Sequence, residues 1–267
     1  MIRLTILGCG SSGGVPRIGG HWGDCDPANP KNRRRRCSVL IDRIGPDGVT
    51  RVLVDTGPDL VAQMLDAGVV TIDAVVWTHA HADHIHGIDD LRQMAFNAGR
   101  ILQGHADRPT TEALLTRFAY IFETPPGSFY PPICVLNAIR GPFEIDGAGG
   151  PVQVTPFVVN HGSIDALGLK IATAGGGIVY LPDVLNIDAA GWDIIGEPEV
   201  FICDALRRKP HSSHAHLDLA VEWINRSGAP RGVLTNMHLD MDYEAVMRDT
   251  PAHIIPAFDG MVIEAAA

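Results

Sequence analysis

The chain has 267 residues, of which 46% are hydrophobic and 19% charged, as in an ordinary globular protein. Its formal net charge of −10 disfavours nucleic acid as the main partner, because binding a phosphate backbone requires a basic face. No apolar run reaches the ~18 residues of a membrane span, and the N-terminus lacks a signal-peptide pattern. The five scattered cysteines contain no C-x-x-C motif and indicate reduced thiols. We therefore expect a cytoplasmic protein without a membrane partner.

Apolar runs between Gly/Pro-rich turns predict most of the secondary structure. Strands are expected at 3–7, 38–44, 50–54, 72–78, 152–159, 167–172, 178–181, 200–203, 231–234 and 261–264. Helices are expected at 59–67, 85–98, 110–122 and 217–225. Hairpin-type strands come first and helices then alternate with strands, which indicates an α+β fold with two mixed sheets and outer helices. No composition shift divides the chain, so we predict a single domain over residues 1–267.

The strongest chemical signal follows the apolar run Val75–Thr78. It reads His79-Ala80-His81-Ala82-Asp83-His84. In an extended segment, residues two apart point the same way, so His79 and His81 can bind one metal ion together. Asp83 and His84 come where the next helix begins, which directs them toward a second ion. Imidazole and carboxylate ligands suit zinc, manganese or iron.

The segment Thr78–His84 resembles the signature of the metallo-β-lactamase superfamily. The resemblance implies a four-layer αββα sandwich and later ligands after three further strands. His161 and Asp183 stand in two of these places. The last ligand usually follows a threonine directly, but here Asn236 follows Thr235, and His238 is the only histidine nearby. We expect His238 to take the role, with its register open.

The ligand set implied by this resemblance holds two divalent ions per chain. His79, His81 and His161 would hold one ion, and Asp83, His84 and His238 the other. Asp183 would bridge the two ions, and Asp83 would also take part in catalysis.

Within the superfamily, the chain most resembles the PhnP-type phosphoribosyl cyclic phosphodiesterases. The matching segments are Gly8–Pro16, Arg36–Ser38, Asp55–Gly57 and Phe258–Met261. Proteins of this type often carry a structural zinc in a cysteine cluster after the Gly-rich loop. Only Cys25 stands in that region, and one thiol cannot make a four-ligand site, so we predict no additional structural zinc.

Three other features of the sequence each have two possible interpretations. Asp55 either orients a metal-bound histidine or caps the helix expected near Pro58. The run Arg33–Arg36 is either a solvated loop or a source of phosphate contacts. The loop around Ser12 either cradles a phosphate on its backbone N–H groups or is a plain turn. A dinucleotide site is excluded, because Val15-Pro16 follows where a helix should begin.

A second His-rich stretch runs from Arg207 to His216. The resemblance places a catalytic histidine that binds no metal here, and His214 is the best match. Such a histidine titrates near neutral pH and can protonate a leaving alkoxide. His211 and His216 remain alternatives, and with Ser12 and Arg208 they are candidate substrate contacts.

The resulting prediction is a binuclear phosphodiesterase for a small, cyclic, ribose-based phosphodiester or a nucleotide-like substrate. A tRNase Z-like RNA endonuclease, a thioester or β-lactam hydrolase and a PqqB-like protein that is not a phosphodiesterase remain alternatives. The sequence leaves open whether the chain forms a homodimer.

Overall fold

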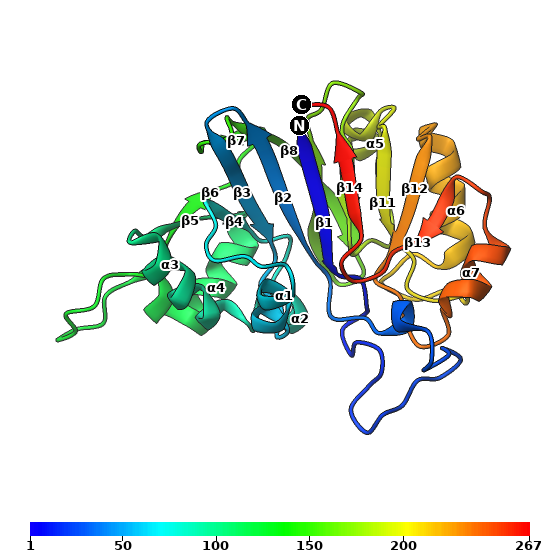
Figure 1. Cartoon of the computed structure of the whole chain (residues 1–267), viewed down its shortest axis with the longest axis horizontal. Coiled ribbons are helices and arrows are strands. Elements are labelled where there is room, and N and C mark those ends of the chain that lie inside the picture. The colour runs from blue at the N-terminus through cyan, green and yellow to red at the C-terminus, as the bar shows by residue number, and fades with distance from the viewer.

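Two sheets of seven strands lie face to face in the computed structural model, which describes residues 1–267 (Figure 1). The first sheet has the order β14 (Val262–Ala265), β1 (Ile2–Gly8), β2 (Ser38–Gly45), β3 (Gly48–Val54), β4 (Ala74–Val76), β5 (Leu102–Ala106) and β6 (Cys134–Ala138). The second has the order β13 (Ile254–Pro256), β12 (Arg231–Thr235), β11 (Val200–Asp204), β10 (Ile178–Leu181), β9 (Ile164–Ile171), β8 (Val152–His161) and β7 (Phe143–Ile145).

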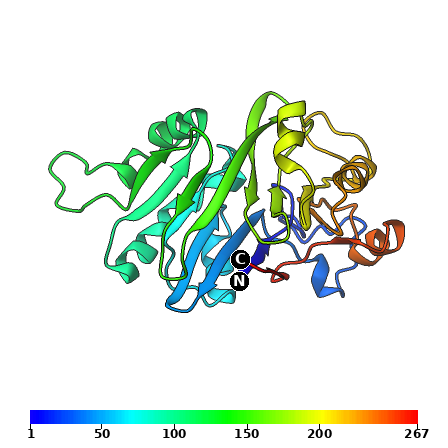
Figure 2. The ribbon, with the colours of Figure 1, turned by 90° about the horizontal axis from the view of Figure 1, so that it is seen from above.

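The helices form the two outer layers, as the views in Figures 1 and 2 show. On the side of the first sheet lie α1 (Leu60–Asp66), α2 (Ala82–Ile85), α3 (Leu91–Ala98) and α4 (Arg108–Phe122). On the side of the second lie α5 (Ala189–Ile195), α6 (Leu217–Ser227) and α7 (Tyr243–Asp249). This confirms the predicted α+β sandwich. None of the helices is both long and apolar enough to cross a membrane.

The strands of the first sheet explain why the sheets and helices stack in this order. Val39 and Ile41 point into the core between the two sheets, whereas Leu40 points to the opposite face. There Leu40 belongs to a separate core with Leu53 and with Leu60 of α1. Both faces are apolar, so the sheet needs a layer on each side. Each fully buried side chain of this kind stabilises the fold by about 1.5–3 kcal/mol.

The prediction of one continuous helix over residues 85–98 is wrong. The structure has α2, then a 3-10 helix (Ile88–Asp90), then α3. The break lies at Gly87, whose N–H donates to Thr56 O at 2.8 Å. A Cβ at Gly87 would lie 2.1 Å from Gly57 O, so the two backbones pack too closely for any other residue. This contact fixes the segment that carries Asp83 and His84.

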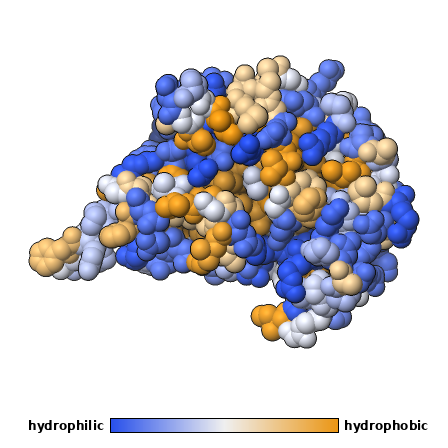
Figure 3. All heavy atoms as spheres, viewed as in Figure 1, coloured by the Kyte–Doolittle hydropathy of each residue, from blue (hydrophilic) through white to orange (hydrophobic).

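Several short elements were not predicted from the sequence, namely β5, β6, β7, β13, α5 and α7. They have three to seven residues each, which is too short for a reliable period. The loop between α4 and β6 projects from the body and fully exposes Phe129 (Figure 1). Figure 3 shows hydrophobic residues at the tip of this projection.

Candidate metal centre

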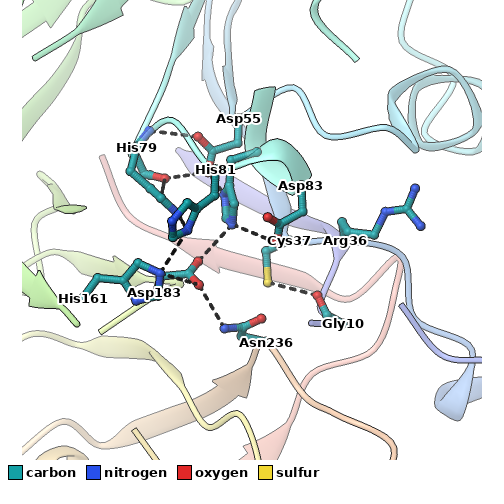
Figure 4. Close-up of polar contacts among 12 residues, drawn as sticks. Gly10, Arg36, Cys37, Asp55, His79, His81, Asp83, His161, Asp183 and Asn236 are labelled. Carbon is teal, nitrogen blue, oxygen red and sulfur yellow. Dashed lines mark hydrogen bonds and ion pairs between the residues drawn. The ribbon is translucent and has the colours of Figure 1, made fainter. Parts of the chain in front are cut away.

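Polar side chains follow or end six strands, and these strand ends meet at one edge of the sandwich. They are Asp55 after β3, His79 after β4, His161 at the end of β8, Asp183 after β10, Asp204 at the end of β11 and Asn236 after β12. Neighbours β3 and β4 are parallel, as are β10, β11 and β12, so their carboxyl ends share an edge. Figure 4 shows most of these side chains converging.

Three imidazoles form the first group of donors, which we call the three-histidine group (His79, His81 and His161). His81 Nδ1 lies 3.0 Å from His79 Nε2 and 3.2 Å from His161 Nε2. Three ring nitrogens this close together can all ligate one ion. His79 and His161 are buried, and His81 lies at the exposed rim.

One imidazole and two carboxylates form the second group, which we call the mixed group (Asp83, His84 and Asp183). His84 Nε2 lies 3.0 Å from Asp183 Oδ2 and 3.5 Å from Asp83 Oδ2. The other oxygen of Asp183 lies 3.8 Å from His161 Nε2, so this carboxylate faces both groups. The arrangement suits a carboxylate that bridges two ions.

Each buried histidine uses one ring nitrogen as an anchor and turns the other inward. His161 Nδ1 donates to Ser213 O at 2.7 Å, and His79 Nδ1 lies 3.1 Å from Thr78 Oγ1. The close approach of Ser213 requires Gly162, which has φ +73°, because a Cβ there would lie 2.6 Å from Ser213 Cβ. Anchors of this kind set the orientation of metal-binding imidazoles.

Asp55 anchors His84 and so follows the first of its two predicted readings. Its carboxylate accepts from His84 Nδ1 at 2.7 Å and from both N and Oγ1 of Thr78 at 2.8 Å. It does not cap the following helix, since α1 begins at Leu60 with Asp59 at the cap position. The fully buried Asp55 thereby ties the end of β4 to the mixed group.

The electrostatics of the two groups differ. Burial lowers the pKa of all three imidazoles of the three-histidine group, so they are neutral and keep a lone pair at neutral pH. Burial also opposes protonation of His84, but the charges of Asp183, Asp55 and Asp83 outweigh it and raise the pKa of His84 well above its usual value. The mixed group therefore attracts a cation.

Two orphaned atoms test whether a metal ion fits here. His84 Nε2 and Asp183 Oδ2 are buried and lie 3.0 Å from each other, but neither makes a hydrogen bond of good geometry. Buried polar atoms without a good hydrogen bond are rare and costly. An ion bound by both would satisfy them, and imidazole with carboxylate suits zinc, manganese or iron. The residues thus fit a divalent metal.

His214 lies beside the metal-binding groups and is held by Asp204, which sequence reasoning missed. His214 Nδ1 lies 2.9 Å from Asp204 Oδ2 and 3.5 Å from Asp183 Oδ1. Burial lowers the pKa of His214, but the hydrogen bond and charge of Asp204 outweigh it, so the net shift is upward. Burial raises the pKa of Asp204 to about 7. The sequence did contain a signal for Asp204, because it is a carboxylate at the end of the apolar, buried strand β11.

The expectation for His238 is corrected by the structure. Its Nδ1 lies 3.3 Å from Asp240 Oδ1, and it belongs to neither metal-binding group. Asn236 faces the centre instead, and its Nδ2 donates to Asp183 Oδ1 at 3.2 Å (Figure 4). Asn236 has φ +59°, so the chain turns directly after β12. This turn directs Asn236 inward and His238 away.

Two of the expected substrate contacts also lie elsewhere. Arg208 pairs with Asp249 at 2.7 Å on the surface, and His216 stands at the N-cap of α6. His211 lies nearer, with its ring 5.2 Å from that of His214. Its Nδ1 is 3.2 Å from Ser213 Oγ, so it supports the loop that holds His161.

Ser12 of the Gly-rich loop does reach the centre. It lines a pocket of about 340 Å³ together with His81, Asp83, Asp183, His214 and Asn236. A larger hollow of about 690 Å³ lies over β1, β2 and β14 and contains none of the metal-binding groups. Three of its four arginines are paired with carboxylates, Arg3 with Glu264, Arg35 with Asp66 and Arg51 with Asp42. The smaller pocket is therefore the candidate active site.

The run Arg33–Arg36 makes no phosphate contact in the pocket and is only partly the solvated loop of the other prediction, because Arg33 is exposed but Arg34 is buried. Arg34 is buried, and its Nη2 donates to Met241 O at 2.7 Å. Arg36 pairs with Asp59 at 2.9 Å and lies on the outer side of Asp83 (Figure 4). These arginines join the loop to its neighbours, and none of the run lines the pocket.

Cys25 offers a test of the expected absence of a structural zinc. Its buried thiol packs against Val15 and Leu239, and Sγ donates to Leu239 O at 3.4 Å. We expect Cys25→Ser to keep the metal content of the wild type and to lower stability by about 1 kcal/mol, as is typical of one substitution. Elemental analysis and thermal denaturation measure both effects. Loss of one zinc ion per chain would contradict the prediction.

Comparison with known proteins identifies the family. The model of the β-lactamase superfamily domain matches residues 50–237. A solved diphosphatase from the PhnP family is 32% identical, with a TM-score of 0.85 over 99% of this chain and 98% of its own. Zinc-bound PqqB from Methylobacterium extorquens is 16% identical with a TM-score of 0.75 over 98% of this chain and 99% of its own, which shows the shared fold.

One curated relative is much longer than this chain. The octanoyltransferase of Porphyromonas gingivalis is 32% identical over 266 residues, which is 97% of this chain but 51% of that protein. The chain thus spans about half the length of this relative. On the evidence of the matching family model and the full-length PhnP-family structure, the chain belongs to the metallo-β-lactamase superfamily and within it to the PhnP family, with the fold and the His/Asp cluster of a metal-dependent hydrolase.

Proposed function

We propose that this protein is a phosphodiesterase that hydrolyses a small, ribose-based cyclic phosphodiester with two divalent ions. The observation that carries the proposal is one pocket of about 340 Å³ that is lined by members of both metal-binding groups, namely His81 and His161 of the first and Asp83 and Asp183 of the second, together with His214. The three-histidine group would hold one ion and the mixed group the other, with Asp183 between them. When bound, two such ions lower the pKa of a water molecule and neutralise charge on a phosphate.

His214 is the proton donor in this proposal. Asp204 holds its Nδ1 at 2.9 Å, so the ring keeps one orientation and a raised pKa. A protonated imidazole at neutral pH can donate a proton to a departing ribose oxygen. Ser12 lines the same pocket from the Gly-rich loop and is a candidate contact for the phosphate.

Two features of the chain favour this activity over its rivals. An RNA endonuclease needs a basic surface, whereas this chain has a net charge of −10, and the arginines at 33–36 do not line the pocket. A thioester hydrolase has less need of His214, because a thiolate leaves without a proton. A PqqB-like protein that is not a phosphodiesterase has no evident use for the His214–Asp204 pair.

A small diphosphate is the second candidate substrate, because the full-length PhnP-family relative is a diphosphatase. Hydrolysis of a diphosphate breaks a P–O bond of the P–O–P bridge, and the leaving phosphate is less basic than a ribose alkoxide. The same ligands would serve, but His214 would contribute less to the rate.

The test compares several substrates on one metal-loaded preparation: a ribose cyclic phosphate, a nucleoside diphosphate, a thioester and a precursor tRNA. We expect the highest kcat/KM for the cyclic phosphate. The His81→Ala variant provides the background rate. A higher kcat/KM for the diphosphate selects the second candidate, and preference for the thioester or the tRNA contradicts the proposal.

A further inference from the structure

Asn236 lies beside the mixed group and donates a hydrogen bond to its carboxylate Asp183. Its side chain is buried, and its Nδ2 donates to Asp183 Oδ1 at 3.2 Å and to Asp204 Oδ1 at 3.1 Å. In this orientation the amide nitrogen of Asn236, which has no lone pair for a metal ion, faces the two carboxylates in place of its carbonyl oxygen. Asn236 therefore holds two carboxylates in place without adding a ligand.

This leaves the two groups with unequal donor sets. The three-histidine group offers three imidazole nitrogens, and Asp183 Oδ1 lies 3.8 Å from one of them. These four donors complete the tetrahedral set that zinc prefers. The mixed group offers only one imidazole, His84, and the carboxylates of Asp83 and Asp183, one of which is shared. Its remaining coordination positions are left to water or substrate.

The fifth nearby imidazole, His214, could share an ion with His161 and Asp183, but it is in no group with His84 and so does not add a donor beside His84. His214 Nδ1 is engaged by Asp204 at 2.9 Å and lies 3.1 Å from Asn236 Nδ2. His238 has turned away to Asp240. No other histidine lines the pocket beyond His81 and His161, which belong to the three-histidine group.

We propose that Asn236 makes the two metal positions unequal, so that the three-histidine group holds its ion tightly and the mixed group holds an exchangeable ion. Oxygen-rich sites suit manganese and magnesium better than imidazole sites do. The preference for zinc over manganese is therefore smaller at the mixed group. This inference rests on the two-ion site of the proposed function, and its test needs no turnover.

The wild-type protein provides the first arm of the test. Apoprotein is titrated with zinc and, separately, with manganese, and the affinities are read by calorimetry, with elemental analysis after gel filtration. We expect one zinc ion retained per chain and a second bound at least about tenfold more weakly, within the ~10–100-fold range of changes around metal sites. Two zinc ions of equal affinity overturn the inference. A single ion at saturation overturns the two-ion proposal with it.

The variant Asn236→His provides the second arm. Histidine, like asparagine, adopts a positive φ more readily than most residues, so it suits the φ of +59°. We expect the second zinc ion to bind at least about tenfold more tightly, so that two ions survive gel filtration. His238→Asn, two residues away and outside both groups, is the matched control and should bind as the wild type does. An unchanged second affinity in a folded Asn236→His protein overturns the role of Asn236.

Discussion

Replacing His81 with alanine should abolish tight binding of the first ion and lower turnover by more than ~100-fold. His81 Nδ1 is central to the three-histidine group, 3.0 Å and 3.2 Å from the other two ring nitrogens. Losing only an anchor of a metal ligand costs ~10–100-fold, so losing a ligand costs at least as much. His81 is exposed, so the fold should persist. Elemental analysis, kcat/KM and thermal denaturation measure the three effects.

His86→Ala is the matched control for this variant. His86 is an exposed histidine five residues further along, and its ring contacts Phe118, 5.6 Å between centroids, and no metal-binding residue. It should retain the metal content and activity of the wild type. Full metal content in His81→Ala would remove His81 from the ligand set and with it the present account of the centre.

Replacing His214 with alanine should leave the metal content unchanged and lower turnover of a ribose cyclic phosphate by ~10²–10⁴-fold, the range for a lost general acid. The loss should depend on the leaving group. A ribose hydroxyl needs a proton as the bond breaks, whereas p-nitrophenolate can leave as an anion. The variant should therefore hydrolyse bis(p-nitrophenyl) phosphate at a rate much closer to that of the wild type.

The control is His216→Ala, which removes a neighbouring imidazole that makes no capping hydrogen bond and does not line the pocket; it should retain the activity of the wild type. Equal losses on both substrates in His214→Ala would indicate substrate positioning instead of proton donation. Loss of an ion in that variant would make His214 a ligand and would also weaken the argument for an exchangeable second ion.

The α+β sandwich and most of the residues of the centre could be predicted from the sequence. His79, His81, Asp83 and His84 come together because they are close in the chain, at the end of one buried strand. His161 and Asp183 were found because ligands after apolar strands follow the family's pattern. Spacing and strand ends are local properties, so they can be read without coordinates.

Which of the later residues reach the centre depends on how distant segments fold together. A backbone turn at Asn236, with φ +59°, points that side chain inward and His238 toward Asp240, and no periodicity in the sequence records such a turn. His214 was already the best match among three neighbouring histidines, and the structure adds a contact that the sequence does not show, because Asp204, ten residues earlier, holds its ring. Side-chain direction at a strand end depends on φ and on contacts between distant segments. Spacing along the chain therefore identified the candidates, but the direction of each side chain depends on the fold.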